Sequence, residues 1–241
     1  MRRASARGGG IRRALKFAGF VLVLAVLVAV GIQVWFYARI AWWATHDPES
    51  TAFMNQRLEN LRAADPRAAL QVRWVPYGQI SAQLKRAVIA AEDAKFVDHD
   101  GFDWEAIQQA MEKNEREGRT VSGASTISQQ LAKNLFLSGE RSWLRKGQEA
   151  VITAMIEHRL TKRRILELYL NVAEWGEGVF GVEAAARHHF GVAAADLTPY
   201  QAAWLAAILP SPRRYRRGTT TPYLEQRVRT ISESMGMAQI P

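Results

Sequence analysis

The sequence contains no cysteine among its 241 residues. This absence excludes a disulfide framework and a thiolate metal site, and it is compatible with an oxidising or a reducing compartment. Acidic residues are also missing from the first 46 positions, which hold six basic residues before the first apolar run: Arg2, Arg3, Arg7, Arg12, Arg13 and Lys16. The rest of the chain holds 26 basic and 23 acidic residues, so most of the net charge of +9 belongs to this tail. The basic composition therefore does not indicate binding to nucleic acid.

A long apolar run covers residues 17–38, and Gln33 is the polar residue that interrupts it. At about 1.5 Å per residue, a helix of this length covers roughly 33 Å, close to the hydrocarbon thickness of a bilayer. A cleaved signal peptide is the alternative, but the run is long and ends in aromatic residues rather than at a small-residue cleavage site. We therefore expect a single-pass transmembrane anchor, with residues 1–16 as a basic cytoplasmic tail and everything after Arg39 outside. In a bacterium with two membranes, this places the folded part on the periplasmic side of the inner (cytoplasmic) membrane.

Beyond the anchor, helical periodicity predominates and no internal repeat is found. We expect a linker with one membrane-proximal helix at 39–76, a mainly α domain at 77–212, and a C-terminal tail with a short helix at 213–241. Within the domain, Trp104, Ile107 and Met111 recur at helical spacing beside a charged face. Ordinary core packing is the usual meaning of such a pattern, and contact with the bilayer surface is the alternative.

Residues 92–101, EDAKFVDHDG, combine four carboxylates with one imidazole at the end of a predicted helix. Glu92 lies one turn after Val88, on the apolar edge of that helix, where partial desolvation favours the protonated form of a carboxyl group. Such a group can act as a base near neutral pH. An acidic, solvated turn is an equally good interpretation. A metal loop is a third, but Gly101 follows Asp98 too closely for the register of an EF-hand.

Two further segments offer polar groups at helical spacing. Residues 122–137, SGASTISQQLAKNLFL, place Thr126 and Gln129 at the spacing of a capping box, so a helix is predicted to begin there. Its next turns present Gln129, Gln130, Lys133 and Asn134, either as a polar face in water or as a binding surface. In residues 141–171, Glu149 follows Arg145 and Lys146 by four and three positions, which indicates a surface ion pair or a carboxylate that orients two cations toward a diphosphate.

Five motifs occur in this order along the chain: EDAKFVDHDG, GASTISQQLAKN, RKGQE, KRRILELYLN and GVFGVEAAARHHFG. Together they resemble the signature motifs of the family 51 glycosyltransferases, over about residues 70–212 and on the side of the monofunctional biosynthetic members. His189, Tyr200 and the arginine-rich end after Pro212 depart from the family's usual pattern. The resemblance implies a lysozyme-like helical domain that polymerises lipid II into β-1,4-linked glycan strands with inversion and release of undecaprenyl diphosphate.

The resemblance also implies roles for particular residues. Glu92 corresponds to the general base and Glu149 to a second glutamate that orients the diphosphate-binding groups. The remaining matched positions are expected to bind substrate: Asp93, Phe96, His99, Ser125, Thr126, Gln129, Gln130, Lys133, Asn134, Arg145 and Lys146. Among these, Lys133, Arg145 and Lys146 match cations that stabilise the departing diphosphate.

The implied partners are lipid II, the growing glycan strand and the bilayer, with other cell-wall synthesis or division proteins as further candidates. A divalent cation (Mg or Mn) can assist in the family, and the sequence shows no dedicated metal cage. Two alternatives remain open. A lytic transglycosylase or glycan hydrolase shares the fold but needs no cationic diphosphate pocket, and a membrane-anchored assembly scaffold would function without Glu92.

Overall fold

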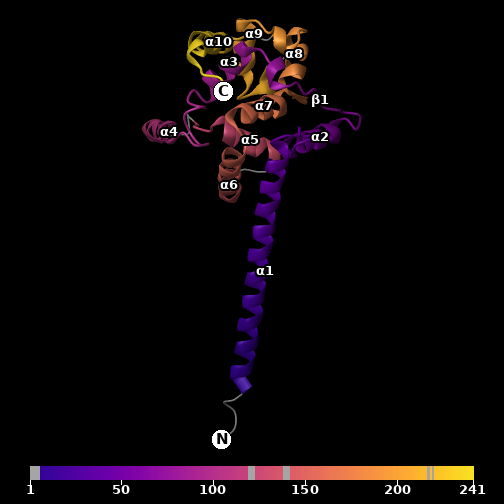
Figure 1. Cartoon of the computed structure of the whole chain (residues 1–241), viewed down its shortest axis with the longest axis vertical. Helices are drawn as coiled ribbons and strands as arrows, with labels where there is room; N and C mark the ends of the chain where they lie inside the picture. The colour runs from indigo at the N-terminus through magenta and orange to yellow at the C-terminus, as the bar shows by residue number, and fades with distance from the viewer. Residues whose placement is uncertain (1–5, 119–122, 138–141, 216–217, 219) are drawn as a thin grey trace.

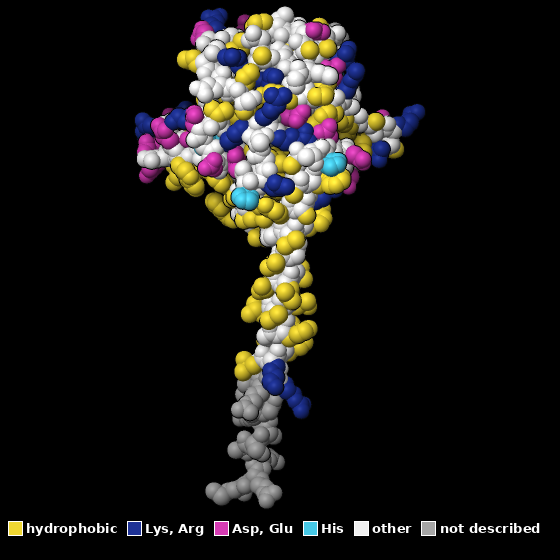
Figure 2. Space-filling model, viewed as in Figure 1, with side chains coloured by type: hydrophobic (Ala, Val, Ile, Leu, Met, Phe, Trp, Pro, Cys, Tyr) yellow, Lys and Arg dark blue, Asp and Glu magenta, His cyan; other side chains and the backbone are white. Residues whose placement is uncertain are grey.

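The computed structural model describes residues 6–118, 123–137, 142–215, 218 and 220–241. A long helix, α1 (Ala6–Trp43), carries a helical domain at its C-terminal end (Figure 1). Within α1, residues Leu15–Trp43 are long and apolar enough to cross a membrane, and none of their most apolar stretch is buried against the domain. Figure 2 shows hydrophobic side chains along this part of α1. The predicted mainly α fold is confirmed, and α1 is a candidate for the predicted membrane anchor.

Nine helices follow α1 in the described part of the chain: α2 (Ala52–Ala64), α3 (Ala82–Glu92), α4 (Trp104–Glu117), α5 (Ile127–Phe136), α6 (Trp143–Arg159), α7 (Lys162–Val172), α8 (Val182–Phe190), α9 (Pro199–Ile208) and α10 (Pro222–Ser234). Most begin at a Ser, Thr or Asp whose side chain accepts a hydrogen bond from a backbone N–H of the first turn: Thr51, Ser81, Asp103, Thr126, Ser142, Thr161, Thr198 and Thr221. These caps satisfy N–H groups that have no partner inside the helix, so the sequence itself fixes where these eight helices start.

The core lies around α7 and α9. Helix α9 is apolar along most of its length and is buried from Ala202 to Ile208, where it packs against α3 and α10. We expected residues 213–241 to form a tail, but α10 buries Leu224, Val228 and Ile231 in this core. The prediction of a separate tail is therefore corrected. Its helix, α10, is part of the folded domain, because its apolar side packs on α3 and α9.

A small sheet in strand order β1-β3-β2 was not predicted. Strand β3 (Val179–Phe180) pairs in parallel with β1 (Gln71–Val72) and antiparallel with β2 (Glu174–Gly176). Strands of two or three residues are too short to show an alternating pattern, so the sequence marked this region only as a break between helices. The sheet ties the linker to the domain across about half the chain.

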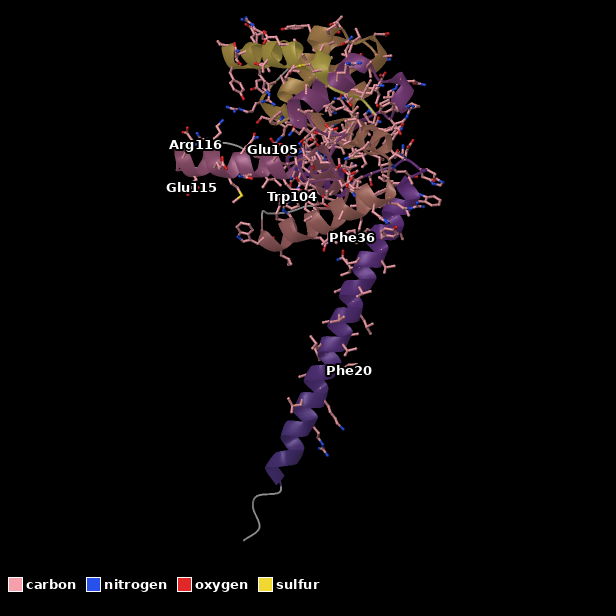
Figure 3. All side chains as sticks on the ribbon, turned by 60° about the vertical axis from the view of Figure 1, so that its left-hand side comes forward. Phe20, Phe36, Trp104, Glu105, Glu115 and Arg116 are labelled. Carbon is pink, nitrogen blue, oxygen red and sulfur yellow. The ribbon has the colours of Figure 1, made fainter. Side chains whose placement is uncertain are left out.

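Helix α4 runs outward from the body of the domain, with Glu115 and Arg116 at its far end (Figure 3). Core packing was the usual interpretation of its apolar positions, and it is wrong for two of them. Trp104 is 71% exposed and Met111 is 67% exposed, whereas Ile107 is half-buried. Trp104 and Met111 are therefore open to the surroundings, whereas Ile107 is partly covered.

Candidate active site

Glu92 is the last residue of α3, and its side chain is only 10% exposed. Its Oε2 accepts a hydrogen bond of 2.9 Å from Nε2 of Gln130, and its Oε1 lies 3.6 Å from Nη2 of Arg227 on α10. Burial raises the pKa of the Glu92 carboxyl group, while the bond from Gln130 and the charges of Arg227 and Lys133 lower it. Burial prevails, as the position on the apolar edge of the helix predicted. The carboxylate is therefore set up to take a proton more readily than an exposed glutamate.

The amide of Gln130 is oriented by Tyr169 on α7. The Tyr169 hydroxyl donates a 2.9 Å hydrogen bond to Oε1 of Gln130, which leaves the NH₂ group of the amide facing Glu92. Burial raises the pKa of Tyr169 well above its usual value, so the hydroxyl stays protonated and remains a donor. The three side chains form a chain of hydrogen bonds from α7 through α5 to α3, and this chain fixes the direction of the Glu92 carboxylate.

Asp93 and His99 join the end of α3 to the start of α5. Oδ2 of Asp93 accepts a 3.0 Å hydrogen bond from the backbone N–H of Ile127, and Oδ1 lies 2.8 Å from Nε2 of His99. Nδ1 of His99 accepts from the backbone N–H of Gly101 at 3.1 Å, so the proton of a neutral ring belongs on Nε2, facing Asp93. The contacts of Asp93 and His99 are thus internal, and they hold the loop beside Glu92 in place.

Gly101 provides the turn that this loop requires, with φ of +91°. A Cβ atom there would lie 2.8 Å from Cγ2 of Thr153 and 2.9 Å from Cγ of Glu157.

We expect Gly101→Ala to lower the free energy of unfolding by about 2–4 kcal/mol through backbone strain and overpacking. Thermal unfolding followed by circular dichroism measures this. Gly118→Ala is the matched control, because Gly118 also has positive φ but has nothing within 4 Å, and its cost should be about 1 kcal/mol. Equal losses in the two variants would contradict the packing argument.

A group of charges on α6 stands beside this site. Glu149 pairs with Arg145 through Nη1 at 3.3 Å and with the ammonium group of Lys146. The Glu149 side chain is 5% exposed, so this is a buried carboxylate holding two cations rather than the ordinary surface ion pair. The Lys146 side chain is 46% exposed and keeps access to solvent. Glu149 therefore holds the charged groups of Arg145 and Lys146 together on α6. That they face a diphosphate stays a prediction.

Lys133 on α5 connects the two halves of the site. Burial lowers the pKa of its ammonium group, the charges of Glu149 and Glu92 raise it, and those of Arg145 and Lys146 lower it. Lys133 thus interacts electrostatically with the base candidate on one side and with the α6 charges on the other. Among the residues that the structure describes, none forms a direct ion pair with it. Its positive charge is consequently available to an anionic ligand.

A cavity of about 480 Å³ opens beside Gln130, Lys133 and Asn134. Its other walls come from Phe53 and Arg57 of α2, from residues at the end of α7 and in β2, and from the segment 209–214. An ion pair of 2.8 Å between Arg57 and Glu174 joins α2 to the sheet at this wall. The cavity is large enough for a sugar-sized ligand, and Lys133 is one of the residues that line it.

The other predicted binding residues differ in what they contact. Thr126 and Gln129 form the predicted capping box of α5 and are buried, and Thr126 also donates to the backbone oxygen of Gly101 at 2.7 Å. Phe96 is fully buried in the core. Ser125 is exposed, at the entrance to α5. Thr126, Gln129 and Phe96 therefore shape the site by holding its helices.

Sequence reasoning missed Arg227, Tyr169 and the α2 residues at the cavity. The motif KRRILELYLN contains Tyr169, but nothing in its spacing indicated a hydrogen bond to Gln130. Arg227 meets Glu92 from a helix 135 positions further along the chain, and only the tertiary structure reveals the contact. Phe53 and Arg57 lie in a segment that the sequence suggested was a linker.

No group of three or more His, Asp or Glu side chains that could hold a metal ion is found in residues 6–118, 123–137, 142–215, 218 and 220–241. The carboxylate nearest the cations, Glu149, already uses both oxygens for Arg145 and Lys146. The described residues therefore do not form a cage for the divalent cation that the resemblance allows.

These features define a class of protein: a helical domain on a helix long and apolar enough to span a membrane, with a buried carboxylate beside a group of cations. A sequence model of the family described as Transglycosylase matches residues 58–236. The chain therefore belongs to the transglycosylase family, which confirms the resemblance. The match also extends through α10, in agreement with its packing.

Similar proteins match over nearly their full length. A protein of Azoarcus sp. (strain BH72) named "Biosynthetic peptidoglycan transglycosylase" is 57% identical over 226 residues, covering 94% of this chain and 97% of that protein. Proteins with the same name from Aromatoleum aromaticum and Bordetella pertussis are 54% and 56% identical, over 96% and 91% of this chain and 100% and 93% of theirs. Because the coverage includes both the anchor and the domain, the similarity concerns the whole architecture.

Proposed function

We propose that this chain is a peptidoglycan glycosyltransferase that polymerises lipid II into β-1,4-linked glycan strands and releases undecaprenyl diphosphate. The observation that carries the proposal is the position of Lys133, which interacts with both Glu92 and the Arg145–Lys146–Glu149 group. A base for a hydroxyl and a set of cations for a diphosphate thereby meet at one place. The names of the relatives, which share more than half of their residues with this chain, support peptidoglycan synthesis as the context.

In the proposed reaction, Glu92 takes the proton from the 4-hydroxyl of the acceptor sugar. The hydroxyl oxygen forms a new bond to the anomeric carbon of the donor sugar, on the face opposite the diphosphate, so the configuration is inverted. The bond from that carbon to the diphosphate oxygen breaks, and its electron pair leaves with the lipid diphosphate. Lys133, Arg145 and Lys146 stabilise the negative charge that develops on this leaving group.

The raised pKa of Glu92 supports the role of base, because a proton acceptor is most effective when its pKa approaches the working pH. Gln130 and Arg227 hold the carboxylate from two sides and limit how far its pKa rises. Both contacts favour the ionised form of the carboxylate, which is the form that accepts the proton. Tyr169 orients the Gln130 amide that donates to Glu92.

The two alternatives make different demands on the same residues. A glycan hydrolase needs a carboxylate acid but has no use for three cations around the leaving group. A non-catalytic scaffold needs neither the buried carboxylate nor its hydrogen-bond chain, and a buried ionisable group without a role lowers stability. The combination of Glu92 with Lys133, Arg145 and Lys146 favours synthesis over both.

The decisive test is to incubate the purified full chain with fluorescently labelled lipid II in detergent and to separate the products by size. We expect long glycan chains that lysozyme digests to small fragments. Release of short products from preformed glycan, without polymerisation of lipid II, would support the hydrolase instead. No conversion of either substrate would support the scaffold.

We further propose that the domain rests on the outer surface of the inner membrane, with the N-terminus in the cytoplasm. The basic residues before the span support this orientation. Helix α6 begins with Trp143, 93% exposed, and Leu144, 86% exposed, on the side of the domain from which α1 leaves (Figure 1). Hydrophobic side chains gather on this underside in Figure 2. Contact of this surface with the bilayer would bring the cavity beside Lys133 to the level of the lipid diphosphate.

Cysteine labelling tests whether the start of α6 enters the bilayer, because the chain has no cysteine of its own. In nanodiscs, a fluorophore on Trp143→Cys is expected to be strongly quenched by a lipid-attached quencher. The matched control is Ser232→Cys, at an exposed position on α10 away from α1, whose label should be quenched weakly. Equal quenching at the two positions would show that α6 does not enter the bilayer.

A further inference from the structure

The polar residue that interrupts the anchor has a specific partner. Nε2 of Gln33 donates a 3.0 Å hydrogen bond to Oε1 of Gln148 on α6, and Nε2 of Gln148 donates a 3.0 Å hydrogen bond to Oε1 of Gln33. The two amides thus satisfy one donor and one acceptor of each other. In hydrocarbon an unpaired amide is costly, so a reciprocal pair is a strong reason for two helices to stay together.

Gln148 precedes Glu149, the carboxylate that holds Arg145 and Lys146. Its amide points to the anchor, whereas the Glu149 side chain is turned to the two cations. Any rotation of α6 that broke the amide pair would also move these charges. The anchor is therefore connected to the cations of the site through two adjacent residues of α6, Gln148 and Glu149.

Other contacts of α1 extend this connection. Tyr37 lies 3.2 Å from Nδ1 of His158, near the far end of α6. Phe36 and Trp43 of α1 pack on Phe136, with ring centroids 5.0 Å and 5.1 Å apart, and Phe136 is the last residue of α5. Figure 3 shows Phe36 where α1 passes beside α6. The anchor thus contacts both helices that carry cations, α5 with Lys133 and α6 with Arg145 and Lys146.

We propose that Gln33 is a positioning residue: through Gln148 it fixes α6 on the transmembrane helix and holds the α6 cations opposite Lys133. The anchor is then a structural part of the active site as well as a membrane tether. The effect on catalysis rests on the proposed function, but the docking of α1 on α6 does not. Self-association of α1 through Gln33 is the competing role of a polar residue in a membrane span.

Crosslinking of the full chain in nanodiscs tests the docking without any substrate. Gln33→Cys combined with Gln148→Cys should be joined within one chain by a short bifunctional thiol reagent. Val34→Cys with Gln148→Cys is the matched control, because the next residue of a helix points about 100° away and should react poorly. Equal reaction of the two pairs, or crosslinks between chains through Gln33→Cys alone, would overturn the proposal.

Kinetics of lipid II polymerisation test the positioning role. Gln33→Leu and Gln148→Leu are each expected to lower kcat by about 3- to 20-fold, the range that corresponds to interhelical polar pairs in membranes. KM should change less, because the cations act mainly on the charge that develops in the transition state. Val34→Leu, at a 61% exposed position of the same helix, should keep the parent kcat.

The double variant Gln33→Leu/Gln148→Leu separates a pair from two independent residues. If the amides act together, the double variant should be about as active as either single variant, since the second substitution removes an amide that has already lost its partner. Multiplied losses would overturn the proposal. If the chain did not polymerise lipid II at all, the proposed function would fail while the crosslinking result still decided the docking.

Discussion

Glu92→Gln is expected to reduce lipid II polymerisation by about 10²- to 10⁴-fold, the contribution that a positioned general base makes. The substituted amide has nearly the shape of the carboxylate, and its oxygen can still accept the hydrogen bond from Gln130. It cannot take the proton of the acceptor hydroxyl. Initial rates with labelled lipid II at saturating concentration measure the loss. The matched control is Glu225→Gln on the exposed face of α10, which should keep the parent rate.

The same variant has a predicted effect on stability. The pKa of Glu92 is raised in the folded protein, so ionisation there costs folding free energy, and this loss develops as pH rises from the unfolded-state pKa through the folded one. Glu92→Gln removes the loss. Its Tm should equal or exceed that of the parent at neutral pH, and the difference should shrink in acid, where the parent carboxyl is protonated in both states. A strongly lowered Tm at neutral pH would mean that the lost activity reports unfolding rather than the lost base.

The pH dependence of the parent enzyme gives an independent check. A base must be ionised to act, so the rate is expected to fall as pH decreases through the pKa of Glu92. Because burial raises that pKa, the acid side of the profile should lie above the ordinary glutamate range. A rate that stayed constant down to the range of an exposed glutamate would contradict the assignment of Glu92 as the base.

Local signals predicted much of this architecture. The capping box of Thr126 and Gln129 and the ion pairs of Glu149 were visible as spacings of three and four residues, because helical neighbours lie close in sequence. The desolvation of Glu92 followed from its place on an apolar helix edge. The anchor was predictable from composition alone. In each case the determining interaction spans one or two turns of a helix.

What the sequence could not predict depends on contacts between distant segments. Tyr169 meets Gln130 from 39 positions away, and Gln33 meets Gln148 across 115. The burial of α10 shows the same limit: its apolar stripe was visible, but the faces of α3 and α9 that it covers were not. The exposure of Trp104 and Met111 reversed the usual expectation, because α4 runs outward from the body of the domain.

Lys133→Met is expected to lower kcat by about 10²- to 10³-fold, comparable to the loss of one preorganised group that stabilises developing charge. Met keeps most of the length and apolar stem of the side chain and removes the ammonium group. The effect should exceed that of Lys146→Ala, because the Lys146 charge is already paired with Glu149, whereas Lys133 interacts with both Glu92 and Glu149 and forms no direct ion pair with a described residue. Rates of lipid II polymerisation under identical conditions compare the two variants.

Two controls separate charge at this position from general changes in the protein. Lys113→Met removes a lysine from an exposed position of α4 and should leave the rate unchanged. Lys133→Arg keeps the charge but changes its shape, so it should recover part of the lost rate. A normal rate in Lys133→Met would remove this residue from the reaction and, with it, the link between Glu92 and the α6 cations. A large loss of rate in Lys133→Met and a smaller loss in Lys133→Arg would instead show that the reaction requires a positive charge between the base and the leaving group.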